Sequence, residues 1–229
     1  GSDNVGIGHR ALQANTTANN NTAVGYQSLY ANTTGFSNVS VGKGALSSNT
    51  TANYNTAVGM ETLRENTTGS SNSAYGLYSL LSNTTGSNNV AVGQSALYFN
   101  TTANNNTAVG YQAGYNNTTG HGSTFIGRLA GNSSNTTGNV RNTFVGHLSG
   151  YGVTTGTSNT FIGAGPNGGS GETITTGSKN TIIGGYNGNQ GGLDIRTSSN
   201  NIVLSDGDGN PRGFFNPSGA LKVPGNAGV

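Results

Sequence analysis

The chain has 229 residues, of which 31% are hydrophobic and only 7% are charged, and its formal net charge at pH 7 is +2. The basic residues are dispersed and form no basic stripe, which argues against a nucleic-acid-binding surface. Because the chain has no cysteine, a disulfide framework is excluded, and no apolar run approaches the length that spans a membrane. Low hydrophobicity is typical of disordered chains, but these also carry high net charge and lack regular patterns. The sequence instead predicts a repetitive, ordered protein.

One 17-residue unit recurs along almost the whole chain, with the pattern N-T-A-V-G-x-x-A-L-x-x-N-T-T-G-x-x. Regular copies begin at Asn4, Asn21, Asn38, Asn55, Asn72, Asn89, Asn106 and Ser123, and looser copies begin at Asn142, Asn159, Asn180 and Asn200. Self-similarity at a short fixed period is typical of stacked repeat architectures. Seventeen residues are too few for a helical hairpin, and no copy shows helical periodicity.

Each unit contains the signals of a short strand and of turns. Positions two to four alternate small and β-branched residues, position five is Gly in eleven copies, and the N-T-T-G segment is rich in turn formers. Two short strands and two corners per unit would make one coil of a solenoid. The sequence therefore predicts an all-β protein, a parallel β-solenoid or β-roll of about 12 coils, roughly 55 Å long.

Stacking the coils places equivalent residues in columns. We expect buried aliphatic columns at positions four and nine and an amide ladder at position twelve. The predicted ladder residues are Asn15, Asn32, Asn49, Asn66, Asn83, Asn100, Asn117, Val24, Val41, Val58, Val92, Val109, Leu29, Leu46, Leu63, Leu80 and Leu97. Two aliphatic side chains per coil make a thin core, so a homotrimer is expected, with the third-position Ala residues near an intersubunit contact.

The repeat pattern divides the chain into three regions. Residues 1–122 carry the regular 17-residue coils. In residues 123–205 the third position becomes bulky, the coils lengthen, and Gly163–Gly171 and Gly184–Gly192 are expected to form protruding loops. The bulkier third position suggests a thicker rod or a changed interface. Residues 206–229 alternate turns and short strands, and are expected to form a β cap over the end of the solenoid.

Two family resemblances follow from these repeats. The N-T-A-V-G core at Asn21–Gly25 resembles the head repeats of YadA-like trimeric autotransporter adhesins, which implies a left-handed, trimeric β-roll. The segments Asn21–Gly35, Asn180–Arg212 and Pro217–Gly225 resemble repeats of bacteriophage tail fibres. That resemblance implies a fibre shaft that holds a host-binding tip.

The N-T-T motifs also match the glycosylation sequon, at Asn15, Asn32, Asn49, Asn66, Asn83, Asn100, Asn117 and Asn135. A stacked turn with an Asn ladder is the favoured interpretation. Their Thr residues raise the hypothesis of an ice-binding face, but neighbouring residues of an extended chain point to opposite sides, so only one column would face outward.

Candidate catalytic and metal-binding residues are few. Asp206, Asp208 and Asn210 have the spacing of a calcium loop, but Pro217 stands where such a loop needs Glu. His9, His121 and His147 lie in distant coils, and Glu61 and Glu65 are expected to be exposed charges; Glu172 and Asp194 on the longer coils remain open as an acid pair. We therefore expect no enzyme activity, no cofactor and no metal.

The sequence favours a structural shaft of a virion tail fibre. The alternative is a cell-surface adhesin or a secreted, glycosylated extracellular filament. The expected partners are copies of the chain itself, as a homotrimer or an end-to-end filament, and a host-surface glycan or protein reached by loops or outer aromatic residues. Neither nucleic-acid binding nor membrane insertion is expected.

Overall fold

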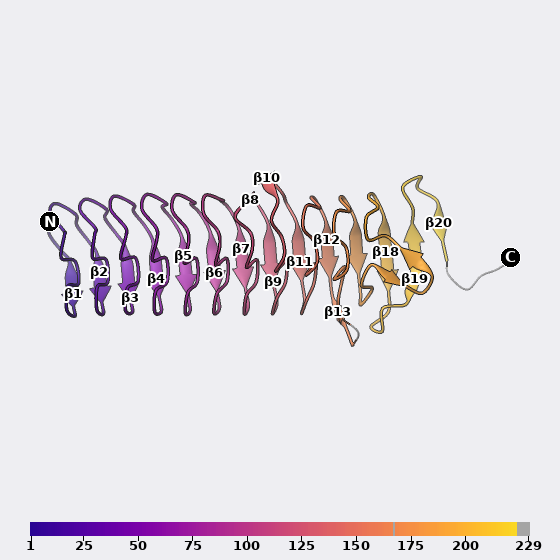
Figure 1. Ribbon diagram of the computed structural model, residues 1–229, viewed down its shortest axis with the longest axis horizontal. Coiled ribbons are helices and arrows are strands. Elements are labelled where there is room, and N and C mark those ends of the chain that lie inside the picture. The colour runs from indigo at the N-terminus through magenta and orange to yellow at the C-terminus, as the bar shows by residue number, and fades with distance from the viewer. Residues whose placement is uncertain (167, 224–229) are drawn as a thin grey trace.

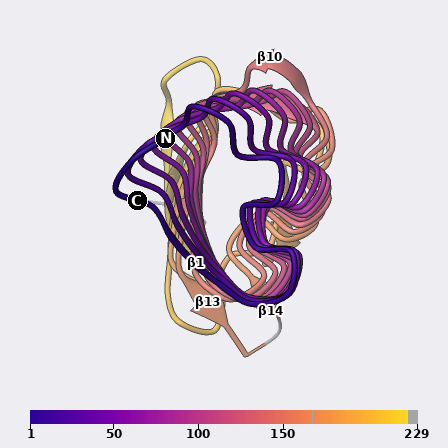
Figure 2. The ribbon, with the colours of Figure 1, turned by 90° about the vertical axis from the view of Figure 1, so that its left-hand side faces the viewer.

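The computed structural model describes residues 1–166 and 168–223. The chain forms a rod of stacked coils that advances steadily from the N-terminus to the C-terminal region (Figure 1). Viewed along the rod, the coils superimpose on one another around a closed outline (Figure 2). The predicted all-β solenoid of about twelve coils is confirmed.

One long sheet runs the length of the rod. Its parallel strands, one per coil, are β1 (Val5–Ile7), β2 (Thr22–Val24), β3 (Val39–Val41), β4 (Thr56–Val58), β5 (Ser73–Tyr75), β6 (Val90–Val92), β7 (Thr107–Val109), β9 (Thr124–Ile126), β11 (Thr143–Val145), β12 (Thr160–Ile162), β15 (Thr181–Ile183) and β18 (Ile202–Ser205). Equivalent positions pair in register, for example Ala57 with Ala74. The 17-residue period therefore becomes a strict axial repeat.

Short accessory strands mark the longer coils. They are β8 (Thr119–His121) with β10 (Thr137–Asn139), β13 (Ala164–Gly165) with β14 (Gly168–Gly169), and β16 (Asn189–Gln190) with β17 (Leu193–Asp194). The first pair is parallel and joins two coils at a corner; the other two are antiparallel hairpins. β13 and β14 lie within the predicted loop Gly163–Gly171 and β16 within Gly184–Gly192, whereas β8, β10 and β17 lie outside both. The β13 hairpin projects from the outline in Figure 2. Asn167 of the first predicted loop lies outside the described residues.

Each regular coil contains one strand, not the two expected. Beyond the strand, the backbone turns through residues with positive φ at positions seven, nine and seventeen, as in Glu61 (φ 53°), Leu63 (φ 52°) and Ser71 (φ 59°). These turns hydrogen-bond to the same turns of adjacent coils, as Leu63 N–H does to Ser79 O at 3.0 Å. A left-handed residue breaks an extended run, so the second strand does not form.

The side chains at positions three and nine form the core of the rod. Ala23, Ala57 and Ala91 are completely buried, and so is the Leu column: Leu29, Leu46, Leu63, Leu80 and Leu97. The expectation that position four is buried was wrong. Val24, Val41 and Val58 are partly exposed, and Val92 and Val109 are 37% and 36% exposed. Because successive strand residues point to opposite faces, burying position three turns position four outward.

The bulky third positions of the later coils also point inward. Phe125, Phe144 and Phe161 are fully buried. Position nine becomes Gly in compensation: a Cβ on Gly131 would lie 2.3 Å from the Phe125 ring, and one on Gly150 would lie 2.5 Å from the Phe144 ring. Positions three and nine thus hold Ala and Leu in the regular coils, and Phe and Gly in the later coils. The bulkier third position is therefore accommodated within the core and is not part of an interface.

The last parallel strand is shifted by one residue from its expected alignment. Thr181 pairs with Ile202 and Ile182 with Val203, so this copy begins at Asn201 instead of Asn200. Val203 is consequently buried and Leu204 exposed. A shift of one residue exchanges the two faces of a strand, and this register keeps Val203 in the core.

Two antiparallel strands follow the last coil. β19 (Pro211–Phe215) pairs with β18, and β20 (Leu221–Lys222) pairs with β19 (Figure 1). Together they extend the long sheet to fourteen strands. They cover the edge of β18, as a cap requires. The final part of the 206–229 region, residues 224–229, lies outside the described residues.

Candidate binding surfaces

The position-twelve Asn residues form a buried amide ladder. Asn49 Nδ2 donates to Asn32 Oδ1 at 2.9 Å, Asn66 to Asn49 at 2.9 Å, Asn83 to Asn66 at 2.8 Å and Asn100 to Asn83 at 2.7 Å. Each amide also donates to the backbone carbonyl three residues on, as Asn66 does to Gly69 O. Asn117 ends the ladder with a 3.5 Å contact to Asn100.

These contacts bear directly on the sequons. Asn32, Asn49, Asn66, Asn83, Asn100 and Asn117 are fully buried, and each amide nitrogen already donates hydrogen bonds within the rod. Glycosylation at these six residues is incompatible with the folded coil. Asn15, in the first coil, is partly exposed, and Asn135 is exposed and accepts a hydrogen bond from Thr118 Oγ1.

A second Asn ladder occupies position one, where the sequence reasoning assigned no role. The backbone N–H of Asn38 donates to Asn21 Oδ1 at 2.9 Å, and that of Asn55 donates to Asn38 Oδ1 at 2.9 Å. The same side chains donate across the coil, as Asn21 Nδ2 does to Gly35 O. The near-invariant Asn at the start of each copy was the signal that could have revealed it.

The Thr residues of the turn form two columns with different environments. At position thirteen the hydroxyls donate to the next coil, as Thr33 Oγ1 does to Thr50 O at 3.1 Å. At position fourteen Thr34, Thr51, Thr68 and Thr85 are exposed. The geometry therefore presents one freely exposed Thr column, as expected from strand alternation.

The outward face of the long sheet, which we call the sheet-face stripe, combines a column of apolar side chains at position four with a column at position two that is mostly Thr. It consists of positions two and four of the twelve parallel strands and contains no charged residue. Its members include Val39, Val90, Val92, Ile126 and Ile162, each between 37% and 41% exposed. At about 50 Å by 10 Å it has roughly 500 Å² of projected area. The largest apolar patch of an ordinary monomer has a similar area and is often functional.

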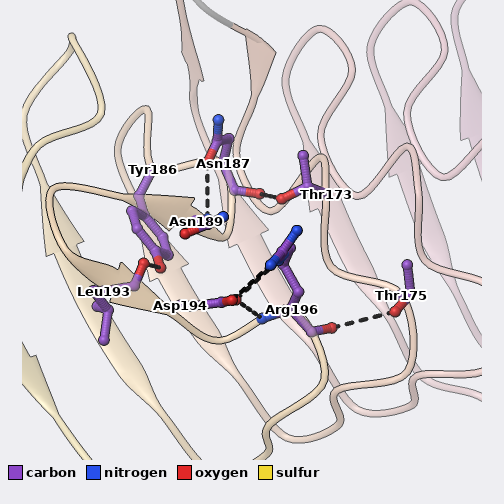
Figure 3. A network of polar contacts seen from close by, with 8 residues as sticks. All are labelled: Thr173, Thr175, Tyr186, Asn187, Asn189, Leu193, Asp194 and Arg196. Atoms are coloured by element: carbon purple, nitrogen blue, oxygen red, sulfur yellow. Dashed lines mark hydrogen bonds and ion pairs between the residues drawn. The ribbon is translucent and has the colours of Figure 1, made fainter.

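A polar cleft lies beside the β16–β17 hairpin and is lined by Thr173, Thr175, Asp194, Arg196 and Thr197, with a volume of about 280 Å³. Figure 3 shows four of these residues, Thr173, Thr175, Asp194 and Arg196. Arg196 holds Asp194 with two side-chain hydrogen bonds, of 3.0 Å from Nε and 2.7 Å from Nη2. This pairing lowers the pKa of Asp194 and raises that of Arg196. The cleft thus presents hydroxyls and an internally neutralised ion pair.

Tyr186 anchors the β16–β17 hairpin beside the cleft. Its ring is buried, and its hydroxyl donates to Leu193 O at 2.8 Å (Figure 3). Burial raises the pKa of this phenol far above its ordinary value, so the hydroxyl stays protonated. Thr173 Oγ1 donates to Asn187 O at 3.0 Å, fixing the hairpin to the preceding coil. The cleft is therefore rigidly supported.

Each acidic candidate is already engaged by another group of the rod. Glu61 and Glu65 both bind Arg64, Asp194 binds Arg196, and Glu172 accepts a hydrogen bond from Gly169 N at 2.9 Å. The three His side chains contact different neighbours: His9 stacks on Tyr26, His121 accepts from Asn104 N, and His147 contacts Arg128.

Asp206 closes a turn between β18 and β19. Its carboxylate accepts hydrogen bonds from Asn210 N–H at 2.9 Å and from the Arg212 side chain. The hydrogen bond from Asn210 N–H is the main cause that lowers the pKa of Asp206 to about 2. Among the described residues, no group of three or more His, Cys, Asp or Glu side chains has the arrangement of a metal site.

Four aromatic side chains gather on the outside of coils five to seven, in what we call the aromatic cluster: Tyr78, Tyr98, Phe99 and Tyr115. Tyr98 and Tyr115 stack with ring centroids 5.2 Å apart, and Phe99 meets both edge to face at 4.7 Å and 5.1 Å. Phe99 is 40% exposed. Burial beside Tyr98 and Tyr111 raises the pKa of Tyr115.

Within residues 1–166 and 168–223, no helix is long and apolar enough to cross a membrane. Comparisons with protein-family models, curated proteins and solved structures find no match. The functional argument therefore depends on the geometry of these surfaces.

Proposed function

We propose that this chain is the structural shaft of an elongated fibre, such as a phage tail fibre, which positions a host-binding tip. The observation that carries the proposal is the unbroken stack of twelve in-register parallel strands, backed by two Asn ladders. Each coil contacts its neighbours through backbone and amide hydrogen bonds, so bending the rod would strain many of them together. Such a molecule suits a spacer exposed on a virion or cell surface.

The shaft is proposed to be a homotrimer, and the sheet-face stripe supports this better than the Ala column does. Ala57, Ala74 and Ala91 are completely buried within one chain and are unavailable to a partner. The stripe, by contrast, is uncharged, and its apolar column at position four runs the whole length of the solenoid. A second copy has the same axial spacing, so its side chains stay in step with the stripe along the full rod.

Two measurements on the purified chain test this proposal. Analytical ultracentrifugation is expected to give three times the chain mass, and small-angle X-ray scattering is expected to give a rod with an axial length of at least roughly 55 Å. A monodisperse monomer with that length would refute the trimer and leave the rod intact. A compact particle would refute the shaft itself.

The alternative function, a cell-surface adhesin, is favoured by the aromatic cluster. Aromatic side chains are enriched at recognition surfaces because they supply apolar area with little conformational entropy. Ser82 and Asn116, which occupy the position of Phe99 in the two adjacent coils, are neutral hydrogen-bonding groups, which suits a neutral glycan.

A glycan array tests the adhesin alternative. The double variant Tyr98→Ala, Phe99→Ala is expected to lose glycan binding that the unchanged chain shows. The matched control removes another exposed aromatic pair, Phe36 and Tyr54, whose rings meet edge to face at 5.1 Å. Equal loss in both variants, or no binding by the unchanged chain, would count against the aromatic cluster as a receptor site.

A further inference from the structure

The sheet-face stripe has one irregular level, at strand β5. Position four is aliphatic in eleven of the twelve parallel strands and is Tyr75 in β5. Position two is β-branched (Thr, Val or Ile) in eleven of these strands and is Ser73 in β5. The largest side chain of one column therefore lies at the same height along the rod as the smallest side chain of the other column.

Both residues of this level face outward. Tyr75 is 42% exposed, although β5 is paired with a strand on either side, and Ser73 is partly exposed. Among the described residues, the paired aromatic rings lie on the turns or in the core, as Tyr98 and Tyr115 do on the turns, and Tyr75 belongs to no such pair. The stripe thus presents a protruding ring beside a position that lacks the second branch of its neighbours.

The other levels of the stripe are almost interchangeable. Strands β2, β4 and β7 have the identical sequence T-A-V. A second copy that slides along the rod by one coil, about 4.8 Å, therefore meets nearly the same side chains and loses the contacts of only one level in twelve. Register is weakly specified in such uniform strands. A lateral assembly of these rods needs a distinct feature to fix its axial alignment.

The occupant that suits the stripe is a further copy of the same chain. The stripe contains no charged residue, so identical copies meet there without like charges facing each other. Three stripes of roughly 500 Å² would together bury roughly 1,500 Å², which is close to the area of a standard protein interface. In a cyclic trimer each contact joins different parts of two neighbouring chains, so column four of one chain can face column two of the next.

We propose that Tyr75 of each chain packs against Ser73 of the next chain, and that this contact fixes the axial register of the trimer. The inference rests on the homotrimer proposed above. A slip by one coil would bring the ring against Thr56 or Val90, which flank Ser73 in column two. Both are β-branched, and Val90 is 37% exposed, so the ring would be overpacked in either shifted register.

Disulfide crosslinking measures the register, because the unchanged chain has no cysteine. Chains with Val109→Cys are mixed and refolded with chains that carry one cysteine in column two. Thr107→Cys lies at the same level as Val109, whereas Val90→Cys and Thr124→Cys lie one coil away on either side. After oxidation, mass spectrometry is expected to find the crosslink to the same level in excess over either shifted crosslink by about tenfold.

The double variant Ser73→Thr, Tyr75→Val tests the cause. It gives β5 the T-A-V sequence of β2, β4 and β7, so the coil itself is expected to fold and the trimer to persist. The shifted crosslinks should then become as abundant as the one at the same level. Adding Thr56→Ser and Val58→Tyr to this variant moves the irregular level to β4 and is expected to restore the single register.

The outcomes separate this inference from the function on which it rests. A monomer in ultracentrifugation would overturn both the trimer and the contact between Tyr75 and Ser73. A trimer whose crosslinks keep the same preference in the double variant would overturn the contact alone, and would show that Ser73 serves only the packing within its own chain. A trimer of unchanged chains that crosslinks equally in all three registers would overturn it as well.

Discussion

At the residue scale, the Gly at position five is the most constrained part of the coil. Gly59 has φ 137°, and a Cβ there would lie 2.7 Å from Gly76 O in the next coil. Both the backbone conformation and the close approach of the two coils exclude a side chain. The same geometry recurs from Gly8 to Gly184, which explains why this position is Gly in eleven copies.

We therefore expect Gly59→Ala to lower the free energy of unfolding by about 3 kcal/mol. Gly44→Ala is the control, since Gly44 has φ 67° and its Cβ would meet only Glu61 Cγ at 3.4 Å. Position seven already accepts Glu61 with a similar φ, so this change should cost about 1 kcal/mol. Urea denaturation followed by circular dichroism measures both, and equal losses would refute the argument.

A second residue-scale prediction concerns the exchange between positions three and nine. Phe144→Ala should cost about 3–5 kcal/mol through the cavity it leaves. Gly150→Leu alone should also destabilise, because its Cβ would meet the Phe144 ring at 2.5 Å. The double variant restores the Ala and Leu pair of the regular coils.

The double variant should therefore lose less stability than the sum of the two single variants, and a double-mutant cycle measures the difference. The left-handed conformation at Gly150 (φ 61°) is close to that of the Leu column, for example Leu80 (φ 50°), so Leu can adopt it. Additive losses would show that the two positions do not share one core volume.

At the element scale, the 17-residue period predicted how the coils stack, but it did not predict the backbone conformation within each coil. Strict repetition in sequence requires repetition in space, so the solenoid and its Asn column followed from the pattern. A three-residue strand such as Thr56–Val58 does not reveal which face is buried, because both Ala and Val are compatible with a core. The burial of position nine was predicted correctly, but its backbone conformation was not: Leu63 has φ 52°, a conformation that Leu rarely adopts.

The candidate sites were likewise not predictable from the sequence, because they depend on how individual coils lie against one another. The polar cleft depends on Thr173, Thr175, Asp194 and Arg196, which come together only because coils of unequal length stack. No spacing in the sequence marks them as neighbours.

The Asn ladder gives an element-scale prediction with a defined pH dependence. In Asn66→Asp, a carboxylate oxygen would replace the Nδ2 that now donates to Asn49 Oδ1 and Gly69 O, each at 2.9 Å. Two acceptors would then face one oxygen, so we expect a loss of about 3 kcal/mol at pH 7. Burial raises the pKa of such an Asp above its ordinary value of about 3.9.

Because the folded variant then holds its proton more tightly than the unfolded chain, its stability falls as pH rises above about 4. Urea denaturation at pH 4 and pH 7 should therefore show a larger deficit at pH 7. Asn105→Asp is the control, since Asn105 is exposed. The same pH dependence in both variants would contradict the ladder argument.

At the scale of the whole molecule, the rod is amphipathic across its width. One side is the uncharged sheet-face stripe, and the turns outside the long sheet carry charged and aromatic side chains, such as Arg64 and Phe99. A solenoid of this kind is stabilised along its axis by contacts between neighbouring coils. These contacts do not cover the stripe, so lateral association is the remaining way to bury it.

The double variant Val92→Lys, Val109→Lys tests this lateral association. Both side chains point outward from a single chain, so the lysines are tolerated by the coil itself, but in a trimer they would place charges in an apolar interface. We expect the sedimenting mass to fall from three chains to one, while the far-ultraviolet circular dichroism stays unchanged. Gln94→Lys, Tyr111→Lys is the control, because these exposed residues belong to the same two coils but lie beyond the position-five Gly, off the stripe. A trimer that survives lysines on the stripe would mean that some other surface joins the chains, and the stripe would then need a different partner.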